Sequence, residues 1–213
     1  MDLGSPLRSL IPTLDSSVLE VLIGTESGLS MTQLSRLAPR GTRQGLALAV
    51  ERLVEHGIVE ATPANRGFLY RLNREHVLAS VVIAASEVRA EITRRMEQEV
   101  VRLTPRPILV SIFGSFARGG GNPGSDIDTL FVVADRKAPD DGWYAQLRSL
   151  ADKVYQWTGN RMEHLTFTET EFRDVITSRE PVVDSWLDDS MVVAGPSIES
   201  LMARVTADRA TRR

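Results

Sequence analysis

The sequence predicts a mixed α/β (α+β) protein made of two small domains and a long helix between them. Three observations carry this expectation. The 213 residues suffice for two modest hydrophobic cores. The N-terminal part shows short helical patterns and then a hairpin pattern, whereas the C-terminal part alternates strand-like and helix-like segments. Apolar residues at helical spacing connect the two parts. We therefore expect one domain over residues 1–74, a connecting helix over residues 75–104 and a second domain over residues 105–213.

Composition excludes several classes of protein. Hydrophobic residues make up 42% and charged residues 25% of the chain, which is typical of globular proteins and not of disordered ones. No apolar stretch approaches the roughly 20 residues that cross a bilayer, and the N-terminus does not resemble a secretory signal. We expect a cytoplasmic protein with no membrane partner. With no cysteine and three histidines, any metal must be held mainly by oxygen.

The first domain is predicted to contain three helices followed by a hairpin. The helical patterns and then the strand-like runs cover residues 14–23, 31–37, 42–56, 58–60 and 67–72. Ser30 and Thr42 are suited to cap the second and third helices, and the segment 62–66 is rich in turn residues. This order, with an arginine at the hairpin tip, resembles the winged helix-turn-helix domains of bacterial regulators over residues 12–74.

Charge within this domain favours a nucleic-acid surface. Residues 36–74 hold seven arginines against three glutamates, a local charge of +4 in a chain whose net charge is −3. The resemblance implies that the third helix enters the major groove of duplex DNA and that the wing touches the backbone or minor groove. The expected DNA-binding residues are Arg40, Arg43, Gln44 and Arg66. The alternative is a surface that docks a protein or an RNA, because a fold alone does not fix its ligand.

The connecting segment carries apolar residues at mixed spacings of three and four, which predicts one continuous helix. Its length of about 29 residues corresponds to roughly 43 Å. We expect its apolar stripe to lie in the core or to form the seam of a homodimer.

The second domain alternates strands and helices. The expected strands cover residues 108–113, 126–133, 162–167 and 191–194, and the expected helices cover residues 141–157, 169–178 and 181–188. This pattern is typical of an α/β domain.

The chemistry is concentrated in residues 111–133, SIFGSFARGGGNPGSDIDTLFVV. Gly114 and Ser115 follow an apolar strand and begin a helical turn, where backbone N–H groups can approach a phosphate. Asp126 and Asp128 stand two residues apart at the head of the next strand, so they share a face and can hold a divalent cation together. An Asp-x-Asp pair alone also occurs in turns and in metal-dependent glycosyltransferases, so the prediction depends on the combination.

The combination resembles the G-S-x10-D-x-D signature of the minimal nucleotidyltransferases of the DNA polymerase β superfamily. Gly114, Ser115, Asp126 and Asp128 match it without a gap, and the resemblance extends over about residues 105–200. It implies a domain with a mixed sheet that moves a nucleoside monophosphate from a nucleoside triphosphate (NTP) to an acceptor hydroxyl, with loss of pyrophosphate. Two magnesium (or manganese) ions would bridge the phosphates and the carboxylates.

The same resemblance gives roles to further residues. The family's third acid lies on a later strand, and Glu163 is the acid within the run at 162–167. The expected catalytic carboxylates and metal ligands are Asp126, Asp128 and Glu163, the last also serving as base. The expected nucleotide-binding residues are Gly114, Ser115, Arg118 and Ser125. For Arg118 the alternative is a surface ion pair, and for Glu163 it is an exposed carboxylate at a strand end.

Two functions follow from these motifs. The first is a magnesium-dependent nucleotidyltransferase with an appended DNA-binding module. The second is a DNA-binding transcriptional regulator whose nucleotidyltransferase-like domain senses nucleotide or serves as a scaffold. The presence of all three carboxylates favours the enzyme. The motifs leave the nucleobase open, and also the acceptor: an aminoglycoside-like drug, a tRNA end, a protein tyrosine or a toxin would suit the same site.

Overall fold

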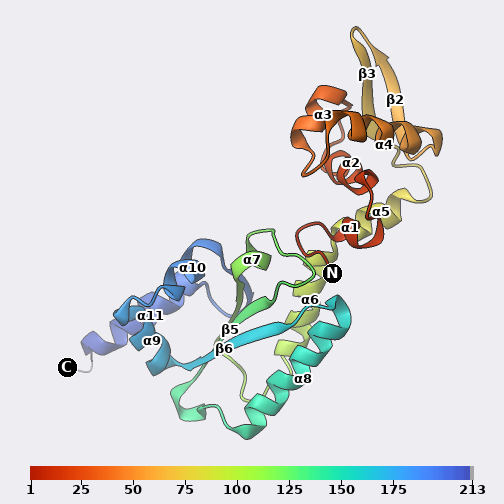
Figure 1. The fold of residues 1–213 in the computed structure, drawn as a ribbon. Helices are drawn as coiled ribbons and strands as arrows, with labels where there is room; N and C mark the ends of the chain where they lie inside the picture. Colours follow the sequence, from red (N-terminus) through yellow and green to blue (C-terminus); the bar gives the residue numbers. More distant parts are fainter. Residues whose placement is uncertain (212–213) are drawn as a thin grey trace. The chain divides into compact units, whose positions relative to one another are not determined.

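The computed structural model describes residues 1–211, apart from the side chains of residues 137 and 208–211. Over these residues it has eleven α-helices and two sheets, so the predicted mixed α/β class is confirmed (Figure 1). The chain divides into two compact units. Residue 2 and residues 4–89 form the N-terminal unit, and residues 1, 3 and those from 90 onward form the C-terminal unit. No helix of the described part of the chain has the length and apolar composition needed to cross a membrane.

Within residues 4–89, helices pack around one hydrophobic core. They are α1 (Pro6–Leu10), α2 (Leu14–Ile23), α3 (Met31–Leu37), α4 (Arg43–Glu55) and α5 (Ala79–Ser86). Both predicted caps are confirmed. Ser30 and Gln33 form a capping box at α3, and the Thr42 hydroxyl accepts the N–H of Gly45 at the start of α4. Gly57, at φ +73°, ends α4 in the left-handed conformation that favours glycine.

The predicted hairpin is confirmed, with a longer first strand. Strands β2 (Val59–Ala64) and β3 (Gly67–Leu72) pair antiparallel, and the short β1 (Leu29–Ser30) pairs with the other side of β3. The turn is therefore shorter than expected and consists of Asn65 and Arg66. Pro63 lies inside β2 because β2 is an edge of the sheet, where a missing N–H on the open side breaks no ladder bond.

The expectation of one continuous connecting helix is wrong. Residues 75–78 form a turn, in which the side chain of Asn73 accepts the N–H of Glu75 at 3.2 Å. Helix α5 then ends at Ser86, and α6 (Val88–Val100) begins after Glu87. The helix breaks because the two halves of its apolar stripe are buried in different units. The buried residues of α5 belong to the N-terminal unit and those of α6 to the C-terminal unit. The buried residues are Ala79, Val82 and Ala85 in α5, and Ile92, Met96 and Val100 in α6.

The C-terminal unit is organised around a mixed sheet. Its strands are β4 (Leu109–Phe113), β5 (Ile127–Val133), β6 (Met162–Thr168) and β7 (Met191–Ala194), in the order β6-β5-β4-β7. β5 runs parallel to β6, while β4 runs antiparallel to β5 and β7. Each predicted strand is found, and no end is shifted by more than one residue.

Helices cover both faces of this sheet. They are α7 (Gly114–Ala117), α8 (Asp141–Thr158), α9 (Glu169–Ser178), α10 (Val182–Asp189) and α11 (Ile198–Thr211), with a 3-10 turn η1 (Asp135–Lys137) after β5. Figure 1 shows α9, α10 and α11 grouped together. On their face, Val132 of β5 shares a buried cluster with Trp186 of α10. On the opposite face, Phe131 meets Trp143 of α8 edge to face, with ring centroids 6.0 Å apart.

Candidate functional site

The turn after β4 brings the start of α7 against the carboxylate of Asp128. Gly114 follows Phe113, the last residue of β4, and Phe113 is the register partner of Asp128 on β5. Gly114 is buried and adopts φ +73°. A Cβ at this position would collide with Oδ2 of Asp128. The left-handed backbone and the close carboxylate both require glycine here.

Three carboxylates lie at the same end of the sheet. Asp126 stands two residues before Asp128, just ahead of β5, and its charge acts on Asp128. Asp128 is also the register partner of Glu163 on the parallel strand β6, and aligned residues of parallel neighbours project to the same side. Asp126 and Asp128 are half-buried, and Glu163 is exposed. The structure thus brings together the three acids that the sequence singled out.

The charges of these groups act on one another. The pKa of Asp128 is raised above its ordinary value by burial first, and then by the negative charges of Asp126 and Glu163. The positive charge of Arg118 lowers it in part. Like-charged carboxylates this close are stabilised by a cation between them.

The carboxylates do not form a closed metal cage. Among the described residues, no three His, Asp or Glu side chains are arranged closely enough to hold a metal ion by themselves. Magnesium is usually bound by one or two carboxylates together with substrate phosphates and waters. The hard oxygen donors beside the Gly114 turn therefore fit a magnesium ion that arrives with a phosphate ligand.

Arg118 forms a surface ion pair, which the sequence left as the alternative to a phosphate contact. Its Nη1 donates to Oδ2 of Asp189, on α10, at 2.9 Å, and its side chain is half exposed. Exposed ion pairs contribute about 0–1 kcal/mol, so a phosphate can compete with Asp189 for the guanidinium. This partner could not be recognised in the sequence, because Asp184 and Asp188 lie on the same helix and offer the same carboxylate.

The two serines of the motif differ in their surroundings. The Ser125 hydroxyl accepts the N–H of Asn122 at 2.9 Å, so it closes the turn ahead of Asp126. Ser115 is half-buried, and within residues 1–211 its hydroxyl makes no hydrogen bond to another side chain or to the backbone. Ser115 is thus the serine whose hydroxyl is open to a ligand.

His164 lies next to Glu163 in the sequence but on the other face of the sheet. Its ring stacks on Tyr144 of α8 with centroids 6.4 Å apart, and burial lowers its pKa. The imidazole is therefore part of the α8 layer, although the negative charge of Glu163 still acts on it and raises its pKa in part.

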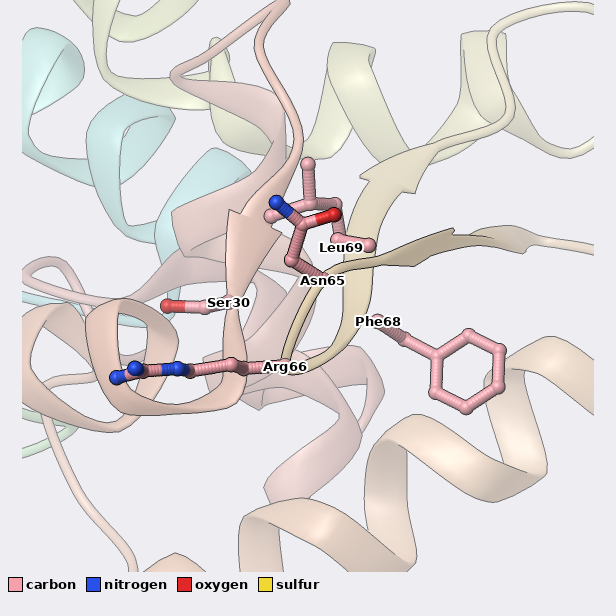
Figure 2. Close-up of a pocket in the computed structure, with 6 residues that line it drawn as sticks. Ser30, Asn65, Arg66, Phe68 and Leu69 are labelled. Atoms are coloured by element: carbon pink, nitrogen blue, oxygen red, sulfur yellow. The ribbon is translucent and has the colours of Figure 1, made fainter.

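In the N-terminal unit, three of the four expected DNA-binding residues are open to solvent. Arg43 and Gln44 are exposed on the first turn of α4, and Arg66 is exposed in the hairpin turn. Within residues 1–211, none of the three side chains is engaged in a hydrogen bond or ion pair that would hold it. Arg66 borders an open pocket of roughly 610 Å³. Figure 2 shows the Arg66 side chain extending on the same side of the hairpin as Ser30, with Phe68 pointing to the other side.

Arg40 is engaged inside the unit. Its Nη2 donates to the carbonyls of Pro12 and Thr13, at 3.2 and 2.7 Å, and to the hydroxyl of Ser16 at 3.0 Å. These bonds tie the residues after α3 to the start of α2. Arg40 is therefore the member of the expected set whose guanidinium already has partners.

Comparison with known proteins identifies one domain. Residues 93–183 match the model of the nucleotidyltransferase domain. A search of curated proteins found no match to the chain.

Solved structures give only distant similarities. A mutant of the toxin–antitoxin pair MntA–HpeT is 15% identical, with a TM-score of 0.39, and covers 56% of this chain and 87% of that chain. A toxin–antitoxin with AMP-PNP is 16% identical, with a TM-score of 0.36 over 56% and 87%. TrmBL2, an archaeal chromatin protein that binds DNA, is 13% identical, with a TM-score of 0.30 over 85% and 75%. At such TM-scores these similarities support no statement about this chain, and the finding that remains is the match of residues 93–183 to a nucleotidyltransferase domain.

Proposed function

We propose that the C-terminal unit is a magnesium-dependent nucleotidyltransferase that moves a nucleoside monophosphate from an NTP to an acceptor hydroxyl. The observation that carries this proposal is the close approach of the Gly114 turn to Asp128, with Asp126 and Glu163 at the same end of the sheet. The turn offers backbone N–H groups to phosphate, and the acids offer oxygen ligands to a cation. The match of residues 93–183 to the nucleotidyltransferase domain supports the reaction class.

The donor set suits magnesium or manganese better than a softer metal. The chain has no cysteine, and His164 faces the other side of the sheet. Asp126, Asp128 and Glu163 would hold the metal together with phosphate oxygens of the bound triphosphate. When bound, it neutralises the charge that develops on the triphosphate oxygens.

The protein's own groups have separate roles in the transfer. The turn at Gly114 and Ser115 orients the triphosphate, and Arg118 exchanges Asp189 for a phosphate oxygen. Glu163 takes the proton of the acceptor hydroxyl. The acceptor oxygen then forms a bond to the α-phosphorus, the bond from that phosphorus to the bridging oxygen breaks, and pyrophosphate leaves with the electron pair.

The transfer is tested with triphosphates labelled at the α-phosphate, magnesium and a cell lysate as the source of acceptors. We expect label on an acceptor with wild-type protein and none with Asp126→Asn or Asp128→Asn, because an amide keeps the shape but loses the charge that holds the metal. Glu163→Gln should still bind the triphosphate but transfer no label.

Asp174→Asn is the matched control, because Asp174 is 71% exposed on α9 and distant in sequence from the motif. Full transfer by Glu163→Gln would contradict the assignment of the base. Binding of nucleotide without transfer by the wild type, under every condition, would favour the sensing regulator over the enzyme.

For the N-terminal unit we propose a winged-helix DNA-binding module. Its helices α3 and α4 precede a hairpin, and Arg43, Gln44 and Arg66 are exposed on α4 and at the hairpin tip. The first turn of such a helix meets base edges in the major groove, while the wing contacts the backbone. The exposed Leu48, one turn after Gln44 and 52% accessible, would contact a thymine methyl group.

DNA binding is tested by a mobility-shift assay at several salt concentrations, against the promoter region of the protein's own gene and a random duplex of equal length. Affinity should fall with salt by about one log–log slope unit per phosphate neutralised. Arg43→Ala should cost about 1–3 kcal/mol if the side chain reads a base. Arg102→Ala, a surface arginine of the C-terminal unit, should have no effect. Absent or salt-insensitive binding to both duplexes would favour protein or RNA docking.

A further inference from the structure

We propose that Asn160 is a positioning residue that holds the backbone of Asp126 in place relative to the strand that carries Glu163, for metal and nucleotide binding. This proposal rests on the function proposed for the C-terminal unit. Asn160 lies in the loop between α8 and β6, three residues before Glu163, and only 1% of its surface is exposed. A buried amide must satisfy its hydrogen-bonding groups inside the protein. The Asn160 Oδ1 accepts a hydrogen bond from the N-terminal ammonium group of Met1 at 2.8 Å, and its Nδ2 donates into the loop that leads to Asp126.

The loop ahead of Asp126 ends in a closed turn. The N–H of Ser125 donates to the carbonyl of Asn122 at 2.9 Å. In return, the Ser125 hydroxyl accepts the N–H of Asn122 at 2.9 Å, and the Asn122 side chain accepts the N–H of Gly124 at 2.8 Å. Pro123 occupies the second position of the turn, where its fixed φ is favourable. The turn is thus a defined unit despite the glycines that precede it.

Asn160 ties down both ends of this turn. Its Nδ2 donates to the carbonyl of Asn122 at 3.1 Å and to the carbonyl of Ser125 at 2.9 Å. These bonds use both hydrogens of the amide. The backbone of Asn160 is itself fixed, because its N–H donates to the hydroxyl of Thr158 at the end of α8, at 3.0 Å. The turn is therefore anchored to a regular helix.

The backbone of Asp126 lies between two such anchors. Ser125, before it, is bonded through its carbonyl to Asn160. Ile127, after it, donates its N–H to the carbonyl of Arg161 at 2.8 Å. The segment that provides both anchors continues directly into Glu163. One of the two anchors that place Asp126 relative to Glu163 is therefore made by the side chain of Asn160.

The first test removes the two donations in two ways, of which only Asn160→Asp keeps the size of the side chain. Asn160→Asp replaces the amide nitrogen by an oxygen, and Asn160→Ser removes the amide without adding a buried charge. Hydrogen exchange of the free protein should become faster over residues 119–127 in both variants and stay unchanged over β4. The matched control is Asn73→Asp, because the Asn73 amide donates to the carbonyl of Gly57 at 2.9 Å in the N-terminal unit.

The second test asks whether the loop matters for the metal. NTP binding is measured against magnesium concentration, at a temperature where melting curves show each variant to be folded. We expect the half-saturating magnesium concentration to rise by about tenfold or more, as for partners that orient metal ligands, and saturating magnesium to restore most of the affinity. A residue that only stabilises the fold would lower the melting temperature and leave the magnesium dependence unchanged.

Unchanged exchange over residues 119–127 in both variants would overturn the proposal. So would faster exchange with an unchanged magnesium dependence, because the loop would then move without effect on the site. A wild-type protein that binds no NTP at any magnesium concentration would contradict the proposed function and, with it, the metal-positioning role. The exchange measurement would still report separately whether Asn160 holds the loop.

Discussion

Position 114 requires glycine for two separate reasons. Its backbone is left-handed, with φ +73°, and a Cβ there would collide with the Asp128 carboxylate. Gly57 adopts the same φ of +73°, but there a Cβ would meet only a ring carbon of His76 at an ordinary 3.8 Å. Each change to alanine should cost about 1–2 kcal/mol from the left-handed backbone. Gly114→Ala should cost more, because its Cβ also displaces the Asp128 carboxylate. Thermal melting and metal-dependent NTP binding check this, and only Gly114→Ala should lose binding. Equal binding by both variants would contradict the close contact.

At neutral pH and without metal, the protein should be less stable with Asp128 than with asparagine at this position. Its pKa is raised in the folded state, so the folded protein binds the proton more tightly than the unfolded chain does. Stability therefore falls as the pH rises from the ordinary value of 3.8 through the raised pKa. Without metal, Asp128→Asn should melt at a higher temperature than the wild type at pH about 7, and this advantage should vanish at about pH 4 or below. An advantage that does not change with pH would show that charge is not its cause.

At the scale of elements, α7 and α10 are linked by the pair of Arg118 and Asp189. If a phosphate replaces Asp189, removing that charge favours the nucleotide. Asp189→Asn should therefore lower the KM for NTP by about 1.4- to 5-fold, the equivalent of the 0.2–1 kcal/mol of an exposed pair, with little change in kcat. Asp188→Asn, the adjacent acid, is the control. A higher KM would show instead that Asp189 holds Arg118 in its binding position.

The elements were predictable from local patterns. Ser30 and Thr42 mark helix starts through their hydroxyls, and the apolar runs of β4 and β5 mark strands in the sheet core. The break at Glu87 was not predictable, because the apolar spacing continues across it while its two halves are buried in different units. Spacing along the sequence reports that a face is buried, but not against which core.

The site was predictable only in part, for a similar reason. The spacing from Gly114 to Asp128 encodes a contact between neighbouring strands, so it can be read from the sequence. Asn160 and Asp189 act through hydrogen bonds across 35 and 71 positions of the chain. A single asparagine or aspartate carries no sign of such a partner until the fold brings the two together.

At the scale of the whole molecule, the chain combines two units with opposite charge requirements. Arg43 and Arg66, proposed to contact DNA, belong to residues 4–89, and Asp126, Asp128 and Glu163 belong to the residues from 90 onward. An acidic metal site would repel DNA phosphates, so the two proposed functions, if they lie in separate units, would each have an electrostatic field suited to its ligand.

The most direct test of the central claim is calorimetric titration of the full chain with each of the four NTPs, with and without magnesium. The account predicts that at least one NTP binds wild-type protein only when magnesium is present, and that Asp128→Asn, checked to be folded by its melting curve, does not bind it. Equal binding by wild type and Asp128→Asn, or binding that is independent of magnesium, would contradict a metal–triphosphate site at the Gly114 turn.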